Sequence, residues 1–273
     1  MPASNAVLSV AIEHLRNNFA AEIEAILAGR YACWLGSGIS ISRYPGLKKL
    51  VWLLLQRIYE RCDFDQQECP WRRCLSNVLG LVEANVADIL PALEASDWTV
   101  AESTLNRLVN CYSDVLDQNI VDGGKHHSMT WDMLHLDEVY GDTAVSPDAD
   151  HTLLAVLLAE GAFQDLITTN WDGLVEKAHC NVCASGNHSL AVVVEASDIA
   201  GSRDAKARII KVHGCACRCL NDQSKREQMV DGLVLQRVCQ TFGGPRFQHV
   251  CVLWSVRGEK LMPSPNEGVP QPR

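Results

Sequence analysis

Strand-length runs of apolar residues alternate along this chain with longer stretches whose apolar residues recur at helical spacing. The short runs fall at 31–35, 165–168, 190–195, 208–212 and 249–254, and the continuous run at 190–195 is typical of a fully buried parallel strand. Helical spacing covers 5–28, 47–61, 151–160 and 173–179. Such alternation predicts an α/β fold, and we expect a Rossmann-like, doubly wound parallel sheet.

Residues 62–150 interrupt this alternation. Their pattern is mostly helical, with helices expected over 75–93 and 100–116, and Pro70, Pro91 and Asp97 punctuate rather than continue a helix. Gly123-Gly124 belongs to a loop-rich stretch before residue 150. We therefore expect one domain over 1–256, with a helical insertion at about 62–150 that acts as a wall or lid. The proline-rich end, 257–273, lacks apolar periodicity and is expected to be a disordered tail.

Composition agrees with a globular protein and adds an expectation about its compartment. The 273 residues are 47% hydrophobic and 21% charged, which is enough for a sizeable core. The longest apolar runs fall far short of the roughly 18 residues that a membrane span needs. The N-terminal stretch has no basic region and carries Glu13 among its apolar residues, unlike a signal peptide. We expect a cytoplasmic protein that does not associate with membranes.

The chain has a net charge of −9, and its charged residues are unevenly spread along the sequence. Residues 203–273 hold twelve Lys/Arg against six Asp/Glu, so the rest of the chain is strongly acidic. An acidic body argues against direct nucleic-acid binding, which requires a basic face. The basic end is either a solvated surface or an attractor for an anionic ligand.

Twelve cysteines are many for a cytoplasmic chain, and two groups of them have spacings that metal sites use. Cys180 and Cys183 form a CxxC pair, while Cys215, Cys217 and Cys219 alternate. Structural zinc prefers two close pairs at turn spacing, and alternation on an extended segment would instead turn the three side chains to one face for burial. We expect no metal, with Cys180, Cys183, Cys215 and Cys217 as the zinc ligands if one is bound.

Three polar segments each follow one of the apolar runs. They are Gly36–Ser40 (GSGIS), Thr168–Asp172 (TTNWD) and Lys211–Gly214 (KVHG). Open α/β sheets bind ligands at the carboxyl ends of their strands, so we expect these segments to meet in one crevice. A glycine loop, an Asn/Asp pair and a lone His together predict a nucleotide site that carries chemistry.

Each segment also has a plain structural interpretation. The glycines of GSGIS allow positive φ and close approach to a pyrophosphate, with Ser37, Ser40 and Arg43 as donors to phosphate oxygens, but the same letters suit an ordinary tight turn. Asp172 is placed to cap the next helix, and a His at a strand end such as His213 is often structural. Their occurrence together and in this order is what favours function.

Taken together, GSGIS, TTNWDGLVEKA and KVHG resemble the glycine-rich loop, the Thr-x-Asn-x-Asp motif and the His-Gly motif of sirtuin-type NAD-binding domains. The resemblance covers residues 31–46 and about 150–214 and is closest to bacterial sirtuin-like domains that hydrolyse NAD⁺ in antiphage defence. It implies that NAD⁺ is the substrate, with His213 as general base and Asn170 and Asp172 at the nicotinamide ribose. The residues that it implies line the dinucleotide are Gly36, Ser37, Gly38, Ile39, Ser40, Arg43, Thr169, Asn170 and Asp172.

The resemblance leaves the reaction open between three functions. The first is an NAD⁺ glycohydrolase that releases nicotinamide and ADP-ribose; the others are an NAD-dependent protein deacylase and a non-catalytic NAD or ADP-ribose sensor. Sirtuin deacylases carry two CxxC pairs after the catalytic His, whereas here one pair precedes His213 and CACRC follows it, which favours the hydrolase. Regulated hydrolases of this kind work with a sensor or activator protein, and a homo-oligomer is a further expected partner. A late strand and loop, in QTFGGPRF and HVCVLW, would have to close over the adenosine.

Overall fold

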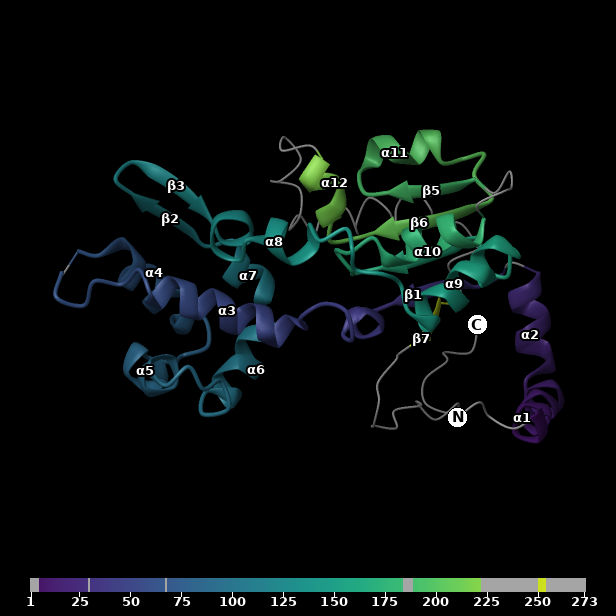
Figure 1. Cartoon of the computed structure of the whole chain (residues 1–273), viewed down its shortest axis with the longest axis horizontal. Coiled ribbons are helices and arrows are strands. Elements are labelled where there is room, and N and C mark those ends of the chain that lie inside the picture. The colour runs from purple at the N-terminus through teal and green to yellow at the C-terminus, as the bar shows by residue number, and fades with distance from the viewer. Residues whose placement is uncertain (1–4, 29, 67, 184–188, 222–249, 254–273) are drawn as a thin grey trace, which may run out of the picture.

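A computed structural model describes residues 5–28, 30–66, 68–183, 189–221 and 250–253 (Figure 1). The protein is mixed α/β and contains a five-stranded sheet in the order β5-β6-β4-β1-β7, in which every neighbouring pair is parallel. Each strand falls on one of the apolar runs, so the predicted parallel α/β sheet is confirmed. The strands are β1 Ala32–Leu35, β4 Asp165–Thr168, β5 Leu190–Val193, β6 Ala207–Lys211 and β7 Val250–Leu253.

Apolar clusters lie on both faces of the sheet because successive strand residues point to opposite sides. Along β1, Cys33 and Leu35 join a cluster with α9 (Ala149–Ala159) and α10 (Leu174–Val182). Ala32 packs on the other face in a cluster that includes Ile199 of α11 (Ala196–Gly201). The sheet is thus a middle layer, with its central strands buried from both sides.

The strand whose continuous apolar run predicted full burial lies at an edge of the described sheet. β5 pairs only with β6 among the described strands, and three of its four residues are half-buried. The continuous apolar run was therefore a misleading guide to burial, because position in the sheet is decided by pairing with distant segments. The run at 249–254 does form a strand, β7, which pairs with β1 on its other side.

The N-terminal helical stretch is two helices rather than one. α1 (Asn5–Asn18) and α2 (Ala20–Leu27) are separated at Phe19, whose φ of −133° and ψ of 28° are not helical. The side chain of Asn18 donates to the carbonyl of His14 and so competes with the helix ladder just before the break. The apolar positions Val10 and Leu27 are exposed.

The helical region forms a second core beside the sheet (Figure 1). Helix α3, although it follows the first strand and loop, contributes Trp52, Leu55 and Ile58 to this core instead of packing back onto the sheet. The packed helical region therefore begins at Leu47, earlier than the expected residue 62. Its helices are α3 Leu47–Tyr59, α4 Pro70–Gly80, α5 Val86–Glu94, α6 Glu102–Asn110, α7 Tyr112–Leu116 and α8 Leu136–Tyr140.

Two predicted helices of this region are each divided into shorter ones, and one proline expected to end a helix lies inside a helix instead. The expected helix over 75–93 is divided because Asn85 caps α5, its backbone N–H bonding the Asp88 carboxylate at 2.9 Å. The expected helix over 100–116 breaks at Cys111 into α6 and α7. Pro91 was expected to interrupt a helix, yet it lies inside α5, where its carbonyl still accepts from the Ala95 N–H.

The stretch expected to be loop-rich contains a β-hairpin. β2 (Asn119–Asp122) and β3 (Lys125–Ser128) pair antiparallel across Gly123-Gly124. Both glycines have positive φ, 55° and 80°, which is what the two-residue hairpin turn requires. One π-helical turn (Met129–Met133) leads from the hairpin toward α8. The insertion is therefore not purely helical.

Other expectations fall outside the described residues, namely the proline-rich tail and the QTFGGPRF segment expected to close over adenosine. In the part of the chain that the structure describes, no helix combines the length and apolar character needed to cross a membrane.

Candidate functional site

The three polar segments begin side by side at the carboxyl ends of neighbouring strands. β4 lies between β1 and β6, with Leu35 paired to Thr168 and Thr168 paired to Lys211. Beyond the strands, the Thr169 N–H bonds the Leu35 carbonyl at 3.3 Å and the Val212 N–H bonds the Thr168 carbonyl at 3.0 Å. The predicted convergence of these segments at one edge of the sheet is therefore present in the structure.

A cavity of about 240 Å³ lies at this edge. Its wall combines the segments after β1, β4 and β6 with residues of the helical region, so both parts of the molecule build it. Of the sequence-predicted site residues it is lined by Ser37, Ser40, Thr169, Asn170, Asp172 and His213. The remaining lining residues are Ile41, Tyr44, Pro45, Gly46, Leu47, Leu50, Tyr112, Tyr140 and Trp171.

Four predicted site residues do not line the cavity. Ser37–Ser40 form a 3₁₀ turn in which Ile39 turns into the apolar cluster beneath the sheet. Gly36 is extended, with φ −98°, and like Gly38 it is not among the positive-φ residues, so the positive φ that these glycines allow is not used in this loop. Arg43 is directed to Asp148, its Nε 3.8 Å from that carboxylate, rather than into the cavity.

Asn170 is almost fully buried, with 5% of its surface exposed. Its Nδ2 donates to Ser40 Oγ at 3.2 Å and to Asp172 Oδ2 at 3.4 Å. Its Oδ1 is buried and has no hydrogen-bond partner among the described residues. An unsatisfied buried acceptor costs about 1–3 kcal/mol, so this oxygen is a candidate contact for a ligand that donates a hydrogen bond.

Asp172 performs the capping role that its position allows. Its Oδ1 accepts the backbone N–H of Leu174 at 3.0 Å, at the start of α10, while Oδ2 accepts from Asn170. Capping and a role in the cavity are thus compatible, because each uses a different carboxylate oxygen.

An aromatic wall faces these polar groups. Tyr44 and Tyr140 are in contact, with ring centroids 4.8 Å apart, and Tyr140 meets the edge of Trp171 at 6.4 Å. Burial, followed by the charge of Asp172, raises the pKa of Tyr44 to about 12 and also raises that of Tyr140. Both phenols therefore stay neutral at physiological pH. Trp171 Nε1 is buried and without a hydrogen-bond partner in the described part of the chain, which adds an unused donor to the site.

His213 enters the cavity from the turn after β6. Gly214 follows it with φ +85°, a conformation that only glycine adopts without strain, so the glycine of KVHG is required by the backbone. The ring of Tyr112 lies edge-on to the imidazole at 6.0 Å. Burial lowers the pKa of His213, which leaves the imidazole neutral and able to accept a proton near pH 7.

A buried cation supports the site from behind, and sequence reasoning missed it. The Nζ of Lys211 lies 2.9 Å from Glu176 and donates to the backbone carbonyl of Asp172, with 1% of the side chain exposed. Burial alone would lower the pKa of Lys211, but the charge of Glu176 reverses this and raises it. The signal available in the sequence was a lysine directly after the apolar pair Ile209 and Ile210, at the end of a strand.

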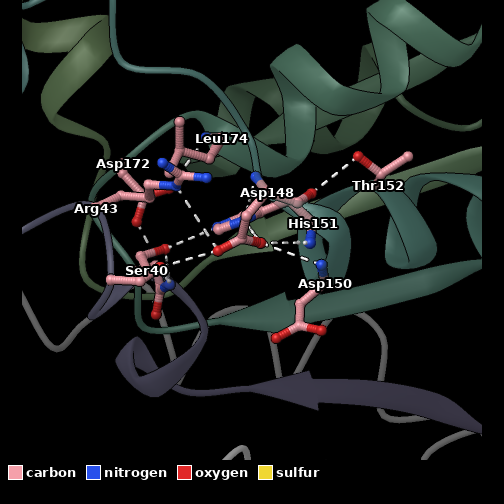
Figure 2. Close-up of polar contacts among 10 residues, drawn as sticks. Ser40, Arg43, Asp148, Asp150, His151, Thr152, Asp172 and Leu174 are labelled. Atoms are coloured by element: carbon pink, nitrogen blue, oxygen red, sulfur yellow. Dashed lines mark hydrogen bonds and ion pairs between the residues drawn. The ribbon is translucent and has the colours of Figure 1, made fainter. Parts of the chain in front are cut away.

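A second missed group lies at the start of α9. His151 is fully buried, and its Nδ1 is 2.6 Å from Asp148 while its Nε2 is 3.1 Å from Ser40 Oγ (Figure 2). Burial alone would raise the pKa of Asp148, but hydrogen bonds from His151 and Ser42 lower it to about 2. The Asp-x-x-His spacing of a capping box, at the start of an apolar helix, was the available signal.

The cysteines do not follow the expected pattern. Cys217 and Cys219 lie in α12 (Ala216–Asn221), so they are helical and the extended alternation expected for CACRC is wrong. Cys180 and Cys183 lie at the end of α10. Throughout the described ranges, His, Cys, Asp and Glu form no group of three or more that could hold a metal ion. A hydrogen bond from the Cys217 thiol lowers the pKa of Cys215.

No protein-family model matches this chain, and no curated protein matches it. The function is therefore argued from the residues and geometry of the site.

Proposed function

We propose that this protein is an NAD⁺ glycohydrolase of the sirtuin-like type, which cleaves NAD⁺ to nicotinamide and ADP-ribose. The observation that carries the proposal is that Asn170, Asp172 and His213 line one cavity at the carboxyl edge of a parallel sheet, together with Ser37 and Ser40. We further propose that the sheet is doubly wound and Rossmann-like, which its apolar clusters on both faces support.

The cavity suits the nicotinamide-ribose half of the dinucleotide. Its volume of about 240 Å³ is small for a whole NAD⁺. Flat rings pack well against aromatic side chains, and Tyr44, Tyr140 and Trp171 provide that surface. Ser37 supplies a hydroxyl donor on the side of the glycine loop. The unused Asn170 Oδ1 can accept from a ribose hydroxyl or from the attacking water.

The residues present match the needs of the reaction. Breaking the N-glycosidic bond develops positive charge on the ribose, which the nearby carboxylate of Asp172 stabilises. Nicotinamide leaves from NAD⁺ as a neutral molecule, so no strong acid is needed. A base must take a proton from the water or ribose hydroxyl, and burial, by lowering the pKa of His213, keeps its imidazole in the neutral form that can accept one. Asn170 orients the nucleophile or the ribose.

The test is release of nicotinamide and ADP-ribose from NAD⁺ by the purified full chain, separated by chromatography. We expect His213→Ala to lower kcat/KM by about 10²–10⁴-fold. Asn170→Ala should lower it by about 10²-fold through loss of positioning. The matched control is His126→Ala, since His126 is exposed on the hairpin and does not line the cavity.

Three other results would redirect the proposal. Nicotinamide release that depends on an acetylated peptide would identify a deacylase. Binding of NAD⁺ or ADP-ribose without turnover would identify a sensor. Turnover that is unchanged in both His213→Ala and Asn170→Ala would show that the reaction does not take place at the proposed site. As a hydrolase, the protein is further proposed to act as an antiphage effector, which loss of cellular NAD⁺ during phage infection would test.

A further inference from the structure

Four side chains form a continuous set of hydrogen bonds that begins outside the cavity and ends in it. Asp148 contacts His151 Nδ1 at 2.6 Å, His151 Nε2 contacts Ser40 Oγ at 3.1 Å, and Ser40 Oγ contacts Asn170 Nδ2 at 3.2 Å. We name this set the hydrogen-bond relay, and Figure 2 labels Asp148, His151 and Ser40 of it. We propose that Asp148, His151 and Ser40 are positioning residues that lock the Asn170 amide with its Oδ1 as the cavity's acceptor for a ligand hydroxyl or N–H.

The first step is the position of the proton on His151. The carboxylate of Asp148 can only accept, so a contact of 2.6 Å places the hydrogen on Nδ1. The backbone N–H of Asp148 also lies 3.3 Å from Nδ1, but a protonated Nδ1 has no lone pair with which to accept it. In the neutral ring Nε2 is then an acceptor, and it faces the hydroxyl of Ser40.

The second step is the direction of the Ser40 hydroxyl. Because Nε2 of His151 accepts, Ser40 donates its one hydrogen there and has only lone pairs left for other contacts. The neighbouring Asn170 side chain must then offer its Nδ2 to Ser40, as the structure has it.

The third step is the orientation of the Asn170 amide. The oxygen and nitrogen of an amide are assigned from their hydrogen-bond partners. Here Ser40 and Asp172 both require the nitrogen, Nδ2, on their side. A flipped amide would place Oδ1 against the lone pairs of Ser40 and against the carboxylate of Asp172, two repulsive contacts in a buried site. Oδ1 is consequently held away from these groups and left without a described partner. Trp171, which also lines the cavity, has a second buried polar atom without a described partner, the donor Nε1.

The arrangement of Asp148, His151 and Ser40 has the order of a serine-hydrolase triad, but its surroundings favour positioning. His151 is fully buried, so it has no exposed nitrogen with which to protonate a leaving group in the cavity. Ser40 is itself buried, and its Oγ is already engaged with His151 and Asn170. We therefore assign Ser40 to positioning and make nucleophilic reactivity an outcome of the test.

The first experiment is independent of any catalytic activity. The full chain labelled with ¹⁵N-histidine is examined by NMR at pH 7.5, and His151 is assigned by the signals lost in His151→Gln. We expect a neutral ring with its hydrogen on Nδ1 and an unprotonated Nε2. A ring with hydrogen on Nε2 would overturn the proposal, because Ser40 could no longer be required to donate.

The second experiment rests on the proposed function and asks whether His151 acts through Asn170. In nicotinamide release, His151→Phe and Asp148→Asn should lower kcat by about 10²-fold, and His151→Gln should recover part of the loss because a Gln oxygen can still accept from Ser40. In an Asn170→Ala background, His151→Phe should cause no additional loss. Equal losses in both backgrounds would show a merely structural role and overturn the proposal.

Controls separate the possible failures. Ser42→Ala removes a 2.9 Å contact to the same Asp148 carboxylate without touching His151, and it should leave kcat within a factor of two. Variants are compared by the fraction folded in thermal melts. If the wild-type protein shows no turnover but His151 carries its hydrogen on Nδ1, the proposed function is refuted and the hydrogen-bond relay is still supported. Labelling of Ser40 by a fluorophosphonate probe would show a nucleophile and overturn the positioning assignment.

Discussion

Lys211 presents the sharpest test of how the site is held together. Its side chain is 1% exposed and is balanced by Glu176 at 2.9 Å, while it also donates to the Asp172 carbonyl. Lys211→Met removes the charge and this donor but keeps most of the side-chain volume. Glu176→Gln instead leaves the lysine charge buried with a neutral partner. Each variant therefore leaves one member of the ion pair without its charged partner: Glu176 in the first and Lys211 in the second.

The magnitude follows from what each variant leaves behind. Removing one partner of a buried ion pair costs about 3–5 kcal/mol. Glu176 retains 19% exposure and can be partly hydrated, so Lys211→Met should lie near the lower end, about 3 kcal/mol. Lys211 has no such access to water, so Glu176→Gln should be the more costly variant, at about 5 kcal/mol. For a chain of this size, about 3 kcal/mol corresponds to a fall of roughly 6–12 °C in Tm.

The assay is urea unfolding of the full chain, with Lys206→Met as the matched control. Lys206 is exposed just before β6, so the control should change the free energy of unfolding by no more than about 0.5 kcal/mol. The double variant Lys211→Met, Glu176→Leu buries no charge and should recover at least half of the loss. A Lys211→Met variant as stable as the control, or a double variant whose losses simply add, would refute the argument.

Three other predictions concern pH and the backbone. Burial lowers the pKa of His213 below its ordinary 6.5, so the acidic limb of kcat/KM for nicotinamide release should lie below pH 6.5; a limb above that value would contradict its role as base. Asp148 has a pKa of about 2 when folded against 3.8 when unfolded, so its contribution to stability is complete above about pH 4 and is lost as the pH falls toward 2. Unfolding free energies of wild type and Asp148→Asn should converge over that interval. A difference between them that does not change with pH would contradict the lowered pKa of Asp148. Gly214→Ala should cost about 1–3 kcal/mol in urea unfolding because φ is +85°, and unchanged stability would show that the turn adapts freely.

Much of the site was predictable from the sequence because its three segments depend on local features. An apolar run that ends in a polar, glycine-bearing loop marks the carboxyl end of a strand wherever it occurs, and parallel strands bring such ends to one edge. Ser37, Ser40, Asn170, Asp172 and His213 therefore line the cavity as expected. The capping role of Asp172 was likewise local, since it involves only the next two residues.

Other features depended on contacts between segments far apart in the chain. His151 and Ser40 are separated by 111 positions, and nothing in the helical pattern of α9 indicates that its first turn meets the glycine loop. The edge position of β5 was hidden for the same reason, because hydropathy reports the composition of a strand and not its neighbours.

The sequence by itself determined the alternation of strands and helices, the places where strands end, and the polar residues that those ends present. These follow from side-chain periodicity and glycine chemistry within a few residues. Only the tertiary structure decided that α3 packs with the helical region, that Lys211 is neutralised by Glu176, and that Arg43 turns to Asp148 instead of the cavity. Those outcomes depend on which charges and apolar surfaces are brought together in space, and long-range packing sets them.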